Sequence, residues 1–170
     1  MSQLKVDSIV PRGGLPSGAS GGITQTIQTF KTDEFSFTTT GVSTFVALTG
    51  LSVTITPQSA SNKILVSGFV SFNMANASLN TIRLKRGSTV VGLGTESNAV
   101  NGLVAGTSNA DRYHPYAFQF LDSPNTTSAT TYSLEMAKSQ GGTLRINRRD
   151  TSSSSGFSAC SCITVQEVSG

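Results

Sequence analysis

The apolar residues of this chain recur with a period of two along almost every ordered stretch, and no stretch has a convincing period of 3.6. The segment Thr131–Ala137 is typical, since Tyr132, Leu134 and Met136 alternate with polar residues. Successive side chains of a strand point to opposite faces. The pattern therefore predicts strands with one buried face and no helix.

Clusters of Gly, Pro, Asn, Asp and Ser separate the alternating runs at nearly regular spacing. Short strands joined by regular turns are typical of antiparallel sandwiches and barrels. The sequence predicts an all-β fold, an antiparallel jelly-roll β-sandwich of about ten strands. The predicted strand segments are Ile23–Lys31, Glu34–Thr40, Thr44–Leu48, Leu51–Ile55, Lys63–Met74, Thr81–Arg86, Thr89–Leu93, Tyr113–Leu121, Thr131–Ala137, Thr143–Arg149 and Phe157–Val168.

Four local features sharpen this prediction. The near-continuous apolar run Lys63–Met74 indicates a strand that is buried on both faces. Gly68 in its middle predicts a bulge or a close approach of another backbone. The pair Gly87–Ser88 predicts a two-residue hairpin turn with glycine first. The polar, Gly- and Asn-rich stretch Gly94–Asp111 predicts a long loop.

The N-terminal residues differ from the rest in composition. Leu4–Val10 alternates weakly, and Pro11–Gly22 is a linker rich in Gly, Pro and Ser. We therefore expect two parts, an extended segment over residues 1–22 and a β-sandwich domain over residues 23–170. The segment is either a flexible tail or an attachment segment, and we favour attachment. The candidate attachment residues are Leu4, Val6, Ile9 and Val10.

Charge is scarce, because charged residues make up 12% of the chain and the net charge is +3. Ser and Thr take the place of charge and make up 48 of the 170 residues. Such a surface suits contact with further copies of the chain or with a neutral, hydroxyl-rich ligand. The sequence contains no basic run of the kind that indicates nucleic-acid binding. It also contains no apolar run long enough to insert into a membrane. Arg145, Arg148 and Arg149 indicate a solvated strand face or a salt bridge between subunits.

No set of residues indicates a reaction centre. His114 is the only histidine, and the nine carboxylates are spread mostly over predicted turns. Cys160 and Cys162 lie two apart and indicate small buried side chains rather than a metal site, since too few further ligands exist. We expect no enzymatic activity, no catalytic residues, no cofactor and no metal.

Tyr116, Phe118 and Phe120 form an aromatic row on one side of a predicted strand. They are candidates for the sandwich core or for an interface between identical subunits, because the centres of homomeric interfaces are also apolar.

The opening Leu4–Ile23, LKVDSIVPRGGLPSGASGGI, resembles the start of small virion proteins of tailed phages, especially phages of marine bacteria and cyanobacteria. The body resembles trimeric jelly-roll heads of the C1q/TNF architecture. The segments that carry this second resemblance are Ser59–Phe72, Thr81–Gly94, Ala117–Met136 and Ser161–Val168.

The resemblance implies a homotrimeric fibre or knob protein in the virion, assembled in the host cytoplasm. Its N-terminal segment would bind other virion proteins of the tail or capsid, and its head would bind host surface glycan. The implied distal loops are Asn73–Asn80, Gly94–Asp111, Asp122–Thr130 and Asp150–Gly156. The chief alternative is a capsid decoration or cement protein that stabilises the shell without binding a receptor. A glycan-degrading enzyme is the least favoured reading.

Overall fold

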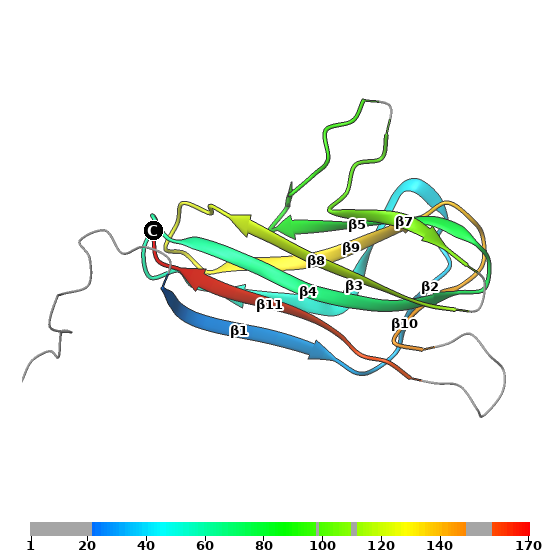
Figure 1. Ribbon diagram of the computed structural model, residues 1–170, viewed down its shortest axis with the longest axis horizontal. Helices are drawn as coiled ribbons and strands as arrows, with labels where there is room; N and C mark the ends of the chain where they lie inside the picture. Colours follow the sequence, from blue (N-terminus) through cyan, green and yellow to red (C-terminus); the bar gives the residue numbers. More distant parts are fainter. Residues whose placement is uncertain (1–21, 98, 110–111, 149–157) are drawn as a thin grey trace, which may run out of the picture.

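The computed structural model describes residues 22–97, 99–109, 112–148 and 158–170, and within them the chain forms strands and no helix (Figure 1). The all-β prediction is confirmed. The eleven strands in this described part are β1 (Ile23–Lys31), β2 (Phe35–Phe37), β3 (Gly41–Ile55), β4 (Lys63–Met74), β5 (Ser78–Arg86), β6 (Thr89–Val91), β7 (Val104–Ser108), β8 (Tyr113–Asp122), β9 (Thr130–Lys138), β10 (Leu144–Ile146) and β11 (Ser161–Val168).

The strands form two antiparallel sheets that pack face to face. In the first sheet, β11 lies between β1 and β4, β8 pairs with the other edge of β4, and the short β10 and β2 extend the row. In the second sheet the order is β3-β9-β5, with β6 and β7 both pairing with β5. The chain crosses repeatedly between the sheets, as in a jelly roll. The predicted sandwich fold is therefore confirmed.

The pairing registers define two ends of the sandwich. Gly22 and Ser169 lie together at the end that we call the terminal end, where the Ser169 amide donates to the Gly22 carbonyl over 2.9 Å. The turns 56–62, 87–88 and 123–129 share this end, because β3, β5 and β8 all finish there. The turns 32–34, 38–40, 75–77 and 139–143 lie at the opposite end, which we call the far end.

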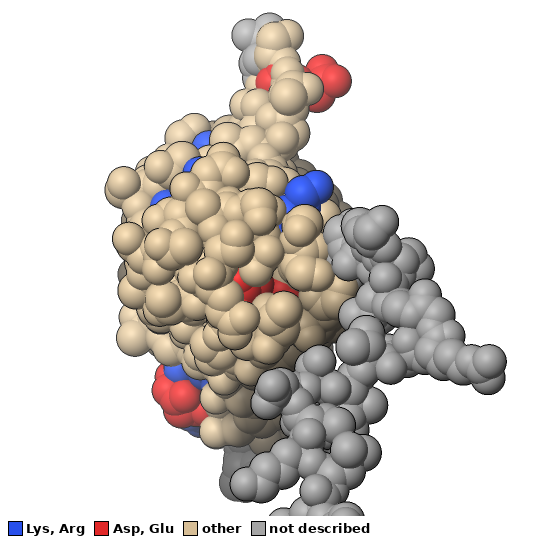
Figure 2. Space-filling view, turned by 90° about the vertical axis from the view of Figure 1, so that its left-hand side faces the viewer, with Lys and Arg blue, Asp and Glu red and all other residues tan. Residues whose placement is uncertain are grey.

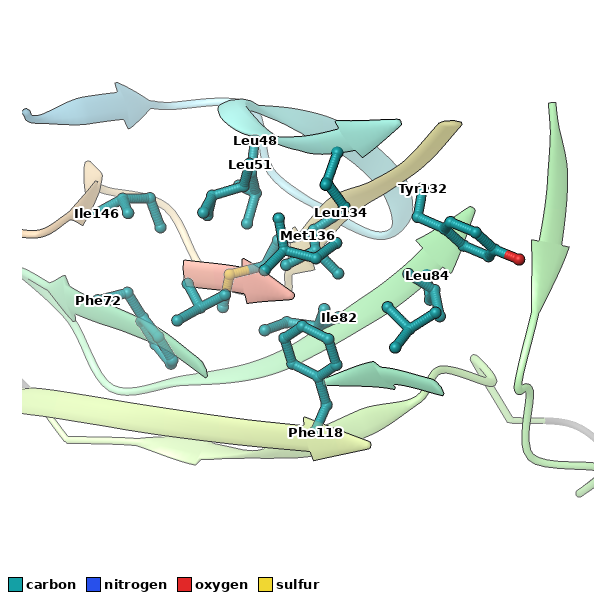
Figure 3. Packing of buried hydrophobic residues seen from close by; sticks show 14 of the residues in the cluster. Leu48, Leu51, Phe72, Ile82, Leu84, Phe118, Tyr132, Leu134, Met136 and Ile146 are labelled. Atoms are coloured by element: carbon teal, nitrogen blue, oxygen red, sulfur yellow. The ribbon is translucent and has the colours of Figure 1, made fainter. Parts of the chain in front are cut away.

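The core lies between the sheets and is built from the inward residues of each alternating run (Figure 3). Phe72 and Ile82 face each other across it and are fully buried. Tyr132 is also fully buried, and its hydroxyl points away from the apolar cluster. The period of two read from the sequence thus corresponds to one core face on each strand.

Two glycine predictions are confirmed. A Cβ on Gly68 would come within 2.9 Å of the Phe118 ring and would also clash with the Cys162 carbonyl. The neighbouring strands β8 and β11 therefore approach β4 closely at this point. Gly87 has a φ of +57° and, with Ser88, forms the turn that joins β5 to β6. Glycine accepts this left-handed conformation without steric cost.

Two predictions are corrected. The stretch Gly94–Asp111 is not wholly a loop, because β7 forms within it and pairs with β5. Burial of β4 on both faces is wrong for the single chain, since its outward residues Leu65 and Phe69 are only half-buried. The strand is central in its sheet, and the second sheet covers only its inward face.

Candidate functional site

A fully buried carboxylate holds the terminal end together. Glu167, on β11, accepts hydrogen bonds from the Gln58 amide at 2.7 Å and from Asn62 Nδ2 at 2.6 Å, and a third from the side chain of Gln25. Burial opposes its ionisation, but these donors outweigh burial and lower the pKa of Glu167 to about 2. One carboxylate therefore links β1, the 56–62 turn and β11 where the described chain begins and ends.

A second buried carboxylate joins the two sheets at the same end. Asp122, on β8, accepts a 2.6 Å hydrogen bond from the Tyr132 hydroxyl and lies 2.9 Å from Arg86 Nη1. Burial, reinforced by the neighbouring carboxylate, raises the pKa of Tyr132. Every group in this cluster has a partner, and the contacts of Asp122 link β8 of the first sheet to β5 and β9 of the second.

The far end is held by cations. Lys138 is buried, and its Nζ donates to the Gly142 carbonyl at 2.8 Å and to the Thr40 hydroxyl at 3.0 Å, among other oxygens. Glu34 pairs with Arg145 at 2.6 Å and with Arg148 at 2.8 Å. Burial opposes ionisation of Glu34, but the two guanidinium groups lower its pKa. These contacts fix the bases of the far-end turns.

The outer face of the second sheet carries an apolar hollow of about 310 Å³. Residues from β3, β5, β7 and β9 line it, and Val100 from the 92–103 connection adds to the wall. The strongly exposed members of this set are Leu79 at 58% and Val42 at 47%. Sequence reasoning missed the hollow, because it depends on β7 pairing beside β5.

The predicted aromatic row lies on the inner side of β8. Phe118 is buried in the core at 6% exposure, while Tyr116 and Phe120 are partly buried and pack against the core. The row therefore faces the second sheet and not the outside. The candidate attachment residues Leu4, Val6, Ile9 and Val10 lie outside the described residues.

The other singled-out residues are dispersed. His114 lies on β8, where Nε2 accepts a 2.9 Å hydrogen bond from the Asn109 amide. Cys162 lies on the outer side of β11 and is buried. Neither Cys160 nor Cys162 forms a disulfide. Within the described ranges, no three His, Cys, Asp or Glu side chains gather as a metal site. The same part of the chain contains no helix that could span a membrane.

One of the loops implied as distal lies elsewhere. The segment Asn73–Asn80 surrounds the 75–77 turn at the far end, but Asp122–Thr130 lies at the terminal end because β8 runs back toward the termini. Placing Asp122–Thr130 among the distal loops was therefore wrong. The loop Asp150–Gly156 falls outside the described residues. Figure 2 looks onto the terminal end, whose visible surface carries few charged groups.

Comparison with known proteins gives similarity of fold only. No family model matches the chain, and no curated protein matches it. Among solved structures, the chain is similar to a structure of infectious bursal disease virus, Gx strain, with a TM-score of 0.49 and 14% identity over 98% of this chain and 45% of that one. A crystal structure of an IBDV viral particle gives a TM-score of 0.47 and 12% identity over 97% and 41%. The chain thus spans less than half the length of these virus-particle chains.

Proposed function

We propose that this chain is a virion structural protein of a tailed phage, a homotrimeric fibre or knob protein. The N-terminal segment attaches it to the tail or to a vertex, and the β-sandwich presents its far end to host surface glycan. The proposal includes the absence of catalytic activity.

The observation that carries this proposal is the separation of the two ends. The described chain enters and leaves the sandwich at the terminal end, where Gly22 contacts Ser169. The far end is made of turns held by Lys138 and by the Glu34 ion pairs. A head fixed through residues 1–21 would therefore carry its free turns on the side away from the attachment.

The chemistry of the far end suits a neutral, hydroxyl-rich ligand. Three of its four turns are uncharged, 38–40 (TTT), 75–77 (ANA) and 139–143 (SQGGT), while 32–34 carries Asp33 and Glu34. The polar side chains of the uncharged turns donate and accept hydrogen bonds without bringing charge. Loops on a rigid β-scaffold often carry binding sites, and several copies would raise a weak contact to useful avidity.

Localisation on the intact particle tests the proposal. We expect cryo-electron microscopy to find a few copies at the tail or at one vertex. Hundreds of copies on the capsid lattice would contradict the fibre proposal and support the alternative, a decoration protein that stabilises the shell.

A pair of matched variants tests the role of the far end. Gly141 lies in the 139–143 turn, and a Cβ there would meet nothing within 4 Å. We expect Gly141→Glu to reduce binding of the purified protein to host cells at least fivefold, because it adds charge and bulk to the proposed contact. The control Ala129→Glu changes an exposed position in the terminal-end turn 123–129 and should bind as the unmodified chain does. Equal binding by both variants would exclude the 139–143 turn from the contact.

A further inference from the structure

The outer faces of the two sheets differ sharply in charge. The second sheet presents Arg83, Lys85 and Glu135 to the outside, and the last two lie 3.8 Å apart as an ion pair. On β1, β11, β4 and β8 of the first sheet, Lys63 is the only charged residue among the described outward positions, and it lies at the terminal end. Arg145 projects from the same sheet only beyond this region, on β10.

The registers place uncharged side chains in rows across these four strands. One row is apolar, another is mixed apolar and polar, and the row between them is made of amides and hydroxyls. We call these three rows the neutral face; they are Phe30–Cys162–Phe69–Ala117, Gln28–Thr164–Ser67–Gln119 and Thr26–Gln166–Leu65–Leu121.

Two large apolar members of the neutral face are strongly exposed in the single chain. Phe30 on β1 is 57% exposed and Leu121 on β8 is 48% exposed, so apolar surface reaches both edges. Between them, Leu65 and Phe69 on β4 are half-buried. Within the part of the chain that the structure describes, the near-continuous apolar run of β4 is therefore covered on its inward side and only partly covered on its outward side.

We propose that the neutral face is the surface through which copies of this chain pack against one another. This inference rests on the proposed function only in taking the protein to be a homo-oligomer. The aromatic row Tyr116, Phe118 and Phe120 lies on the inner side of β8 and packs in or against the core. The proposed interface lies on the outer side of the same strand.

The near absence of charge favours a second copy as the occupant. A partner chosen by charge would find almost nothing to pair with on the neutral face, whereas a neutral surface meets a copy of itself without repulsion. The centres of protein interfaces are depleted of charged residues and enriched in aromatic side chains. The middle row, with Gln28, Thr164 and Gln119, supplies donors and acceptors that can bond across the interface.

Single lysines placed on this face test the proposal in the full chain. Gln119 on β8 and Thr26 on β1 are exposed, so Gln119→Lys and Thr26→Lys should leave the fold intact. We expect each variant to weaken self-association at least tenfold, measured by analytical ultracentrifugation across a concentration series. The control Thr131→Lys adds the same charge at an exposed position of the second sheet and should not change the mass.

Two results would overturn the proposed interface. Circular dichroism and thermal unfolding establish first that each variant is folded. A folded Gln119→Lys and a folded Thr26→Lys that both keep the unmodified mass would overturn the proposal. An unmodified chain that stays monomeric at tens of micromolar would overturn it too, in favour of a different protein as the occupant.

Failure of this inference can be told apart from failure of the proposed function. An oligomer that dissociates as expected but is missing from purified particles would contradict the virion role and leave the neutral face as the interface. If the protein is found on particles but the lysine substitutions leave the mass of its oligomer unchanged, only the proposed interface is contradicted.

Discussion

At the scale of single residues, buried polar groups have the clearest consequences. Glu167 is fully buried and has three separate donors, which come from β1 and from the 56–62 turn. Removing its charge leaves these donors with a weaker acceptor in a place that water does not reach. The residue therefore stabilises the terminal end by fixing three segments of the chain at once.

We expect Glu167→Gln to lower the free energy of unfolding at pH 7 by about 1.5–3 kcal/mol, the range for hydrogen bonds to charged groups. The folded pKa, about 2, lies below the ordinary value of 4.5, so the contribution of the carboxylate is present above about pH 4.5 and is lost as the pH falls toward 2. Urea unfolding at pH 7 and pH 3 should show the gap between the two proteins narrowing at the lower pH. Glu96→Gln, at an exposed loop carboxylate, is the control and should change little.

At the scale of the element, most strands could be predicted because alternation directly reports a half-buried sheet. The predicted runs Thr44–Leu48 and Leu51–Ile55 are parts of the single strand β3, which shifts register around Gly50 at a φ of +85°. β7 could not be predicted, since Val104–Ser108 is short and Val104 is its only large apolar residue, followed directly by Ala105 and Gly106. Only its pairing with β5 makes it a strand.

The long strand β4 gives a prediction at this scale. Gly68 lies opposite Phe118, and the aromatic ring occupies the space in which a Cβ would lie. We expect Gly68→Ala to lower the free energy of unfolding by about 1–3 kcal/mol through overpacking. The control Gly141→Ala has open space around it and should be neutral or slightly stabilising. A Gly68→Ala protein as stable as the unmodified chain, by thermal or chemical unfolding, would mean that β8 can shift to admit the methyl group.

The candidate site was less predictable than the fold. The row Tyr116, Phe118 and Phe120 reads equally well as core or as interface, because alternation identifies two faces without saying which is inward. The structure decides this through the second sheet, which covers the row. The neutral face is likewise spread over four strands far apart in sequence, and only the registers bring its rows together.

At the scale of the whole molecule, the sandwich should be independent of the segment that precedes it. β1 begins at Ile23, and the contacts of Gly22 are with Ser169 inside the described domain. We expect the chain from Gly22 to Gly170 to fold and to keep its oligomeric mass, and to be absent from particles when it replaces the full chain. Circular dichroism, ultracentrifugation and particle composition measure the three properties. Normal incorporation of the shortened chain would show that residues 1–21 are not the attachment.

The neighbouring positions of Gly22 and Ser169 also determine how the domain responds to mechanical load. β1 and β11 are antiparallel neighbours, so the hydrogen bonds between them lie perpendicular to the strands. Force applied between the two termini would open that ladder one bond at a time, like a zipper. Force applied between Gly22 and the far-end turns runs along the strands, so it would load the β1–β11 ladder in shear. A head tethered through its N-terminus and pulled at its far end would therefore resist in its stronger direction.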